Sequence, residues 1–178
     1  EDALPDYRPN PDSRDRNPEL WDEYPVQCLT GRRIPVYFHS EHRQLPWCRE
    51  VWPVPRVEIN PEDAAEWGIE QGDWVWIESP HGKIRETADL YYGIPRGVIN
   101  CEHTWWYPEM PAPEHGWRYS AVNQLVNNDI DDPHCGSAIV RGYPVKVYKA
   151  TADNSPFGNP CPCTEDGTEI IHDASDAR

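Results

Sequence analysis

Residues 57–91 read VEINPEDAAEWGIEQGDWVWIESPHGKIRETADLY and predict a strand, a short helix and a hairpin, in that order. Val57 to Ile59 forms the strand, and Asn60 after it can cap the N-terminus of a helix. Pro61 suits the first helical position, and the acids that follow it favour the positive end of the helix. Gly68 supplies the left-handed conformation in which many helices end. We therefore expect one short helix, framed by strands, near the centre of the chain.

The second half of this stretch predicts a β-hairpin. The run Trp-Val-Trp-Ile between Asp73 and Ser79 is typical of a strand that is buried on both faces. Pro80-His81-Gly82 then closes a turn onto a second strand, which extends from Ile84 to Tyr91.

The flanking regions add short strands and long loops. Too few helices are predicted to cover the faces of a parallel sheet, so a small closed β-barrel fits the pattern better than an α/β fold. The stretch from Arg32 to Pro55 is a long loop, and long ordered loops are usually functional. A weak helix is expected from Ala121 to Val126. The remaining strands are expected at Val26 to Thr30, ending at Gly31, at Val98 to Asn100 and at Pro144 to Tyr148, with an aromatic loop from His103 to Pro108.

Charge separates a folded body from the two ends of this 178-residue chain. Of the net charge of −15, residues 1–23 contribute 8 acids and 3 bases, residues 24–150 contribute 17 and 12, and residues 151–178 contribute 6 and 1. The prolines of residues 1–23 favour an extended connector rather than a helix, and residues 151–178 are expected to form an acidic C-terminal tail. Because such a surface repels nucleic acid and anionic lipid, we expect no nucleic-acid partner.

Several functional classes lack their motifs in this chain. The six cysteines match no tight disulfide framework, so we expect thiols. One proline separates Cys161 from Cys163, which is too short for the usual metal knuckle, and the seven histidines show no zinc spacing. The sequence has no glycine-rich phosphate loop and no pattern that nominates a catalytic triad. No apolar run approaches the roughly 18–20 residues that span a bilayer, so we expect no direct membrane insertion.

An ordered set of short motifs resembles one known family. It begins with Thr30-Gly31-Arg32 and His39-Ser40-Glu41, and continues through the strand, helix and hairpin of residues 57–82. The further pieces are Gly97-Val98, His103 to Glu109, Asn123 with Leu125, Asp132-Pro133 with Gly136, and Val145 to Val147. In order, they cover nearly all of residues 24–150 and resemble the molybdopterin dinucleotide-binding domain of the dimethyl sulfoxide reductase superfamily. The resemblance implies a mainly β fold, a six-stranded double-psi β-barrel at the C-terminal end of a long catalytic chain.

The resemblance also implies a cofactor and partners. The cofactor is a bis(molybdopterin guanine dinucleotide) carrying molybdenum or tungsten, with the metal ligand and any iron–sulfur cluster outside this chain. The parent is then an oxidoreductase, such as one of anaerobic respiration, and this chain alone is not expected to be catalytic. The implied partners are upstream domains of the same polypeptide and an iron–sulfur electron-transfer subunit. A reductive or non-redox reaction on an aromatic or alkyne substrate stays open beside oxyanion reduction, and the compartment, periplasmic, membrane-associated through partners or cytoplasmic, is undecided.

The first candidate contacts to this cofactor are Thr30, Gly31 and Arg32. Glycine lets the backbone approach an anion, and arginine can bind two phosphate oxygens at once. His39 and Ser40 match a family position at which a histidine followed by a hydroxyl residue faces the cofactor. An ordinary turn with an exposed arginine, and a structural histidine in a loop, are the competing interpretations. His42 and Arg43 are weaker candidates.

A second group of candidates lies further along the chain. His103-Thr104-Trp105 stands where the family often has His-Gly-Trp, so Thr104 adds bulk and puts close backbone contact with the pterin in doubt. Asn123 matches an asparagine that hydrogen-bonds the pterin in the family, although it could instead cap a helix. Arg141 could supply a further cation or simply be solvated.

A free-standing tryptophan-rich carbohydrate-binding module is the rival hypothesis. In that case Trp105, Trp106 and Trp117 would form an exposed platform on which sugar rings stack.

Overall fold

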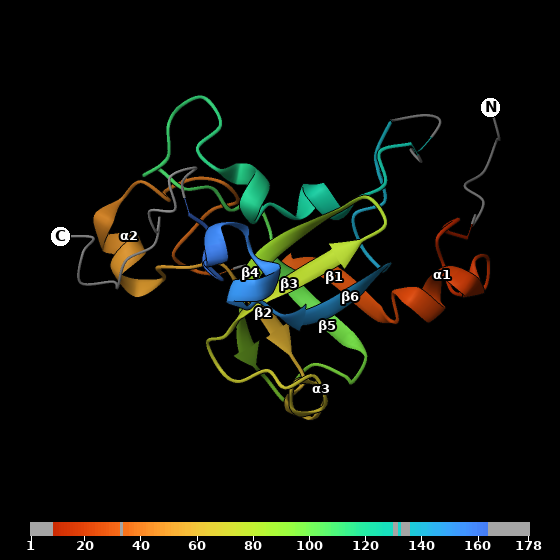
Figure 1. The fold of residues 1–178 in the computed structure, drawn as a ribbon. Coiled ribbons are helices and arrows are strands. Elements are labelled where there is room, and N and C mark those ends of the chain that lie inside the picture. Colours follow the sequence, from red (N-terminus) through yellow and green to blue (C-terminus); the bar gives the residue numbers. More distant parts are fainter. Residues whose placement is uncertain (1–8, 33, 130–131, 133–135, 164–178) are drawn as a thin grey trace.

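Six short strands close into a barrel in the computed structural model, which describes residues 9–32, 34–129, 132 and 136–163 (Figure 1). The strands follow one another around the barrel in the order β1-β5-β2-β4-β3-β6. The pairs β1–β5 and β2–β4 are parallel, and the other four pairs are antiparallel. The expected mainly β, six-stranded double-psi β-barrel is confirmed. The bounds are β1 Val26–Arg32, β2 Arg56–Ile59, β3 Trp74–Ser79, β4 Gly82–Leu90, β5 Val98–Glu102 and β6 Tyr143–Lys149.

The central helix and hairpin form as their sequence signals predict. Helix α3, Pro61–Glu66, begins after Asn60, whose side-chain oxygen accepts a hydrogen bond from the backbone N–H of Glu62 at 2.9 Å. It is followed by Gly68 with a φ of +67°. Strands β3 and β4 pair as a hairpin from Ser79 opposite Gly82 outward.

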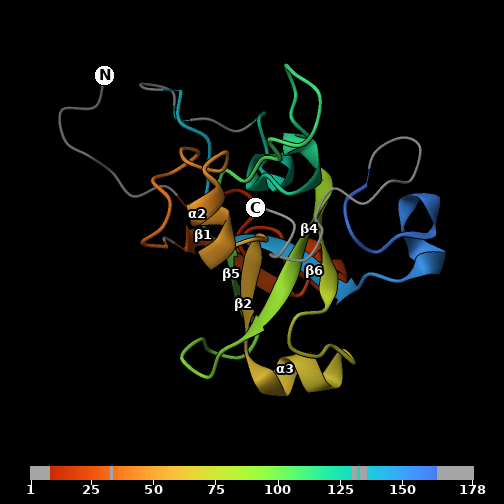
Figure 2. The same ribbon diagram turned by 90° about the vertical axis from the view of Figure 1, so that its left-hand side faces the viewer.

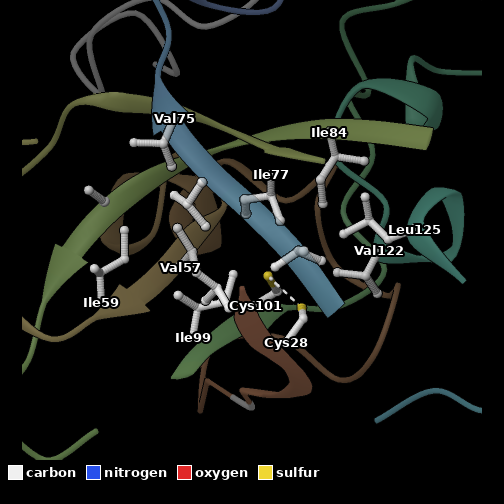
Figure 3. Packing of buried hydrophobic residues seen from close by; sticks show 14 of the residues in the cluster. Cys28, Val57, Ile59, Val75, Ile77, Ile84, Ile99, Cys101, Val122 and Leu125 are labelled. Atoms are coloured by element: carbon white, nitrogen blue, oxygen red, sulfur yellow. Dashed lines mark hydrogen bonds between the residues drawn. The ribbon is translucent and has the colours of Figure 1, made fainter. Parts of the chain in front are cut away.

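Small aliphatic side chains and two thiols fill the interior of the barrel (Figure 3). Val75 and Ile77 of β3 point inward and are fully buried, whereas Trp76 lies on the outer face of the strand and is 5% exposed. Residues near the C-terminal end of the described chain cover Trp76, because its indole N–H donates to the side-chain oxygen of Asn154 at 3.1 Å. Strand β3 is therefore largely buried on both faces, as expected.

The N-terminal connector is not wholly extended, contrary to our expectation for residues 1–23. Residues Pro18–Glu23 form helix α1, because Asn17 accepts a hydrogen bond from the backbone N–H of Leu20 and Pro18 occupies the first turn. Trp21 of this helix is buried, and its indole N–H donates to the carbonyl of Asp12 at 2.8 Å.

The expected acidic tail also has structure where it is described. Residues 151–163 contain two short 3₁₀ helices, η3 Ala152–Asn154 and η4 Pro156–Gly158. The buried guanidinium of Arg85 donates to the backbone carbonyls of residues 159, 160 and 161 at 2.9–3.0 Å, which fastens this segment to β4. Residues 164–178 lie outside the described residues.

Three smaller expectations also need correction. Strand β1 does not end at Gly31 but continues to Arg32, with an irregular register after Leu29. The loop from Arg32 to Pro55 contains helix α2, Pro46–Val51. The weak helix expected around Ala121 to Val126 is the 3₁₀ helix η2, Val122–Leu125, which follows a similar turn, η1, Trp117–Tyr119. No helix in the described part of the chain has the length and apolar character needed to cross a membrane.

Candidate functional site

Two loops bring four of the candidate residues, His39, Ser40, His103 and Thr104, to one end of the barrel, opposite α3 (Figure 2). Strands β1 and β5 run in parallel and both end there, and β2, antiparallel to β5, begins there. The loop after β1 spans residues 33–55 and includes α2, and the loop after β5 spans residues 103–119. We call this end the rim.

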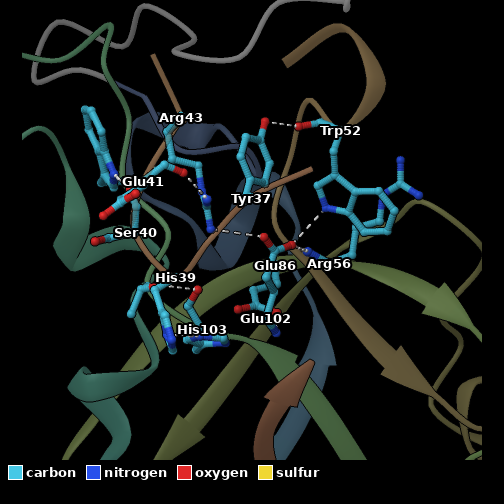
Figure 4. Close-up of polar contacts among 12 residues, drawn as sticks. Tyr37, His39, Ser40, Glu41, Arg43, Trp52, Arg56, Glu86, Glu102 and His103 are labelled. Carbon is cyan, nitrogen blue, oxygen red and sulfur yellow. Dashed lines mark hydrogen bonds and ion pairs between the residues drawn. The ribbon is translucent and has the colours of Figure 1, made fainter. Parts of the chain in front are cut away.

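The rim brings His39 and His103 into direct contact (Figure 4). Nδ1 of His39 lies 3.0 Å from Nε2 of His103, and the two rings meet edge to face. Next to this pair, the indole N–H of Trp106 donates to the carbonyl of Ser40 at 2.6 Å. His39 and Ser40 are both exposed residues.

Thr104 adopts a backbone conformation that disfavours its side chain. Its φ is +62°, and its hydroxyl donates to the carbonyl of His103 at 2.7 Å. A β-branched residue in the left-handed region is strained by about 1–3 kcal/mol, whereas glycine is not. This explains why the resembled family favours glycine here, and it shows that Thr104 keeps the backbone bend despite its bulk.

A buried ion pair forms the floor beneath the two histidines. Arg43 and Glu102 are each 1% exposed, and their charged groups lie 3.4 Å apart. Glu102 also accepts a hydrogen bond from the indole N–H of Trp52 at 2.9 Å. Burial lowers the pKa of Arg43, and the charge of Glu102 opposes that effect. Sequence reasoning ranked Arg43 low and missed Glu102, although Glu102 directly precedes His103.

Aromatic rings enclose the Arg43 guanidinium and fix its position. It lies 3.9 Å from the ring centre of Tyr37 and 4.7 Å from that of Trp105, distances at which cations are attracted to ring faces. Burial raises the pKa of the Tyr37 hydroxyl above its ordinary value, so Tyr37 is neutral at physiological pH. The hydroxyl donates to the carbonyl of Trp52 at 2.7 Å.

Arg49 fastens the two rim loops together. From helix α2 it donates to the carbonyl of Arg43 at 3.3 Å and pairs with Glu109 of the second loop at 2.8 Å. The contact between His39 and His103 is thus supported by the Arg49–Glu109 pair, which joins the two loops, and by the buried Arg43–Glu102 pair.

A pocket of about 40 Å³ opens between the histidine pair and the ion pair. Its lining includes His39, His103, Arg43, Glu102 and Tyr37. The space suits a few water molecules and is far too small for a dinucleotide. A large ligand would therefore lie across the rim rather than inside the barrel.

The first motif, Thr30-Gly31-Arg32, lies at the end of β1, where the Thr30 hydroxyl and the Gly31 N–H already have hydrogen-bond partners. The hydroxyl of Thr30 donates to the carbonyl of Val140, and the N–H of Gly31 donates to the side-chain oxygen of Asn100 at 3.1 Å. The side chain of Arg32 lies outside the described residues. The Thr30 contact places this motif one residue from Arg141.

The remaining candidates, Asn123 and Arg141, lie outside the two rim loops. Asn123 is exposed on η2, and Arg141 is exposed in the segment before β6. Of the candidates, the structure therefore places His39, Ser40, His103 and Thr104 together in the two rim loops.

The structure does not support the exposed tryptophan platform that the carbohydrate-binding hypothesis requires. Trp105 has no exposed surface, because it packs beneath the rim against Tyr37 and Tyr107. It therefore cannot stack on a sugar ring. Among the described residues, no group of three or more His, Cys, Asp or Glu side chains could hold a metal ion, and no disulfide is found.

Sequence comparisons identify relatives of this chain. Residues 28–143 match the family model described as Molydopterin dinucleotide binding domain. A dopamine dehydroxylase of Eggerthella lenta is 67% identical over 156 residues, which cover 88% of this chain and 15% of that protein. An acetylene hydratase of Syntrophotalea acetylenica is 31% identical over 155 residues, which cover 83% of this chain and 21% of that protein.

A solved structure agrees with these sequence matches. The acetylene hydratase from Pelobacter acetylenicus superimposes with a TM-score of 0.75 and 28% sequence identity, over 82% of this chain and 21% of the other. The chain spans only 15% and 21% of the length of the two relatives that it matches in sequence.

Proposed function

Because this chain belongs to the family of molybdopterin dinucleotide-binding domains, we propose that it binds and positions a bis(molybdopterin guanine dinucleotide) as the C-terminal domain of a larger molybdenum or tungsten oxidoreductase. The rim carries this proposal, because the contact between His39 and His103 joins two loops that hold four of the candidate residues there. Since the chain spans 15% and 21% of two relatives, upstream domains of the same polypeptide would form the rest of the cofactor cleft.

The groups on the rim fit the chemistry of this cofactor. A dinucleotide offers pyrophosphate oxygens, a pterin edge that donates and accepts hydrogen bonds, and a guanine. His39 and Ser40 are exposed residues, and an imidazole and a hydroxyl can supply both donors and acceptors. When bound, the cofactor supplies the metal centre at which electrons and oxygen atoms are exchanged. The residues of this chain would orient it and exclude water from one side.

Two clusters of contacts are proposed along the rim. The first consists of His39, Ser40, His103 and Thr104. The second consists of the Thr30-Gly31-Arg32 motif with Arg141, which the Thr30–Val140 hydrogen bond brings near each other along the backbone. Because the Thr30 and Gly31 groups bind within the barrel, Arg32 and Arg141 would carry the charge contacts of this cluster. Asn123 is a separate proposed contact.

The parent enzyme is proposed to remove a hydroxyl group from an aromatic ring by reduction. The 67% identity to a dopamine dehydroxylase favours this substrate class over alkyne hydration, where the identity is 31%. In this reaction two electrons and two protons replace the carbon–oxygen bond with a carbon–hydrogen bond and release water. An iron–sulfur subunit would supply the electrons. Assays of the full-length enzyme with a reduced dye and either a catechol or acetylene separate the two possibilities.

Cofactor content tests the binding role directly. In the full-length enzyme, Arg32→Ala combined with Ser40→Ala should lower the molybdenum or tungsten and guanine retained after purification by about tenfold, since each lost charged or polar contact weakens retention. Lys149→Ala is the control, because Lys149 pairs with Asp73 at 2.7 Å at the α3 end. Full occupancy in the double variant would remove the rim from the cofactor site.

A further inference from the structure

The contact between His39 and His103 limits where their protons can be. At 3.0 Å, Nδ1 of His39 and Nε2 of His103 share one hydrogen bond, so one nitrogen carries the proton and the other accepts it. Each neutral ring has one further nitrogen and one ring proton. The tautomer of one histidine therefore fixes the tautomer of the other.

The second ring nitrogen of the exposed His39, Nε2, is the atom whose protonation this coupling controls. When His39 donates to His103, its Nε2 is an acceptor, and when His103 donates to His39, that Nε2 carries a proton and donates. If the pair gains one proton, Nε2 of His39 carries an N–H whichever ring holds the charge. A second added proton would place two N–H groups against each other across 3.0 Å, which is unfavourable.

Contacts from the base of the pocket and from both loops hold the two rings in place. At the base of the pocket Arg43 pairs with Glu102 at 3.4 Å, and Tyr37 is neutral. The buried carboxylate of Glu86 on β4 accepts a hydrogen bond from the backbone N–H of Glu102 at 3.2 Å. From the first loop, Phe38 packs edge to face against His39, and the neighbouring charge is Glu41, 3.7 Å from His42. From the second loop, His115 packs against Trp106 with ring centres 5.3 Å apart.

We propose that His39 and His103 act as one proton-sharing pair that takes up a single proton when an anionic oxygen of the cofactor, from its pyrophosphate, binds Nε2 of His39. This inference rests on the proposed function. His39 is the contact residue, and His103 is a positioning residue that sets the protonation of His39. His39 and His103 are 64 residues apart in sequence, so each of the two loops contributes one half of the group that would contact the anion.

The sign of the pH dependence follows from the charge of the ligand. An anion binds the protonated pair more tightly than the neutral pair, so binding of the anion and uptake of the proton favour one another. Retention of the cofactor is then greatest at low pH and falls as the pH rises through the range of about 5 to 8 in which histidines titrate.

The experiment measures guanine retained by the full-length holoenzyme after gel filtration at a series of pH values. Between about pH 5.5 and 8.5, the rate of guanine loss from the wild-type enzyme should rise about tenfold, and the rate in His39→Asn should show no such rise. In His103→Gln, where His39 alone can still take up a proton, the rise should occur over a different pH range from that of the wild type. Asparagine places an amide near Nδ1 and suits the φ of +50° at His39, so the loop is preserved. Glutamine places an amide near Nε2 of His103 but cannot take up a proton.

The controls separate this proposal from the binding proposal. His42→Gln should keep the wild-type profile, because His42 faces Glu41 and not the pair. A wild-type pH profile in His103→Gln would overturn proton sharing and leave His39 acting alone. If His39→Asn and His103→Gln weaken retention equally at every pH, the rim binds the cofactor but the pair does not titrate. If retention is unchanged throughout in these variants and in the Arg32 and Ser40 double variant, the binding proposal itself fails. Thermal unfolding checks that each variant is folded. If His103→Gln does not fold, His39→Asn decides the test, because His39 is exposed and its replacement leaves the core unchanged.

Discussion

At the α3 end of the barrel, glycines occupy turns that need a left-handed backbone, and Gly68 and Gly97 have φ values of +67° and +73°. At the rim, the same region of φ is taken by His39, His42, Thr104 and His115, with values from +44° to +74°. Glycine meets this geometry without strain, while other residues keep it only if their surroundings hold them there. The α3 end is built for stability, and the rim accepts strain to present particular side chains.

The two ends also differ in how far apart in sequence their supporting residues lie. At the α3 end, Asn60 and Gly68 shape their own helix through contacts with immediate neighbours. At the rim, the support comes from pairs such as Arg43 with Glu102, which are 59 residues apart. The rim should therefore be the more sensitive end to loss of a single buried partner.

The largest predicted effect is the loss of the ion pair under the rim. Arg43→Met removes the charge but keeps an apolar stem, which leaves the buried carboxylate of Glu102 without its cation. We expect the free energy of unfolding to fall by about 3–5 kcal/mol. Urea unfolding of the folded enzyme, followed by tryptophan fluorescence, measures this change.

A double variant shows whether the charge itself is responsible. Arg43→Met combined with Glu102→Gln should recover much of the lost stability, because the two side chains interact directly. Equal losses in the single and double variants would mean that packing of Arg43 between Tyr37 and Trp105, not the ion pair, supports the rim.

A smaller effect is predicted for the buried carboxylate at the α3 end. Asp63 is 4% exposed and accepts hydrogen bonds from the N–H of Gly97 at 2.6 Å and from Arg96 at 2.7 Å. Asp63→Ala should lower the free energy of unfolding by about 2 kcal/mol, since the Gly97 N–H loses a charged acceptor. Cofactor retention should not change once the protein is folded.

The exposed Glu66 provides a matched control for Asp63. It also contacts Arg96, but its side chain is 60% exposed. Glu66→Ala should have a much smaller effect on the urea midpoint than Asp63→Ala, and equal effects would contradict the importance of the buried Gly97 contact.

Local signals explain what could be predicted from the sequence. The helix after Asn60 and the hairpin around Pro80-His81-Gly82 depend on residues close in the chain, and both formed as expected. The sequence Asn17-Pro18-Glu19 repeats the Asn-Pro-Glu signal that begins α3, and it does begin helix α1. We expected extended chain there because the other prolines of residues 1–23 favour an extended conformation. Burial of Trp21 stabilises α1 and is a tertiary effect that local pattern does not contain.

The candidate site was predictable only as separate pieces. The family resemblance pointed to His39 and His103 individually, but a contact between residues 64 positions apart depends on how the barrel closes. Glu102 carries no motif of its own, and its role comes from its burial beside Arg43 and Trp52. The contact of Arg85 with residues 159–161 was missed for the same reason.

The smallest predicted effect tests whether rim strain serves a purpose. Thr104→Gly should raise the free energy of unfolding by about 0.5–1 kcal/mol, because relief of the left-handed strain exceeds the added flexibility of glycine in the unfolded chain. Gly68→Ala, at a similar φ with no atom within 4 Å of the added Cβ, should lower the free energy of unfolding by a comparable amount. If Thr104 holds His103 in place through its hydroxyl, the stabler Thr104→Gly enzyme should lose guanine faster than the wild type. A stabler variant with unchanged retention would show that the strain at Thr104 has no part in binding, and the contrast between the two ends would then be one of geometry alone.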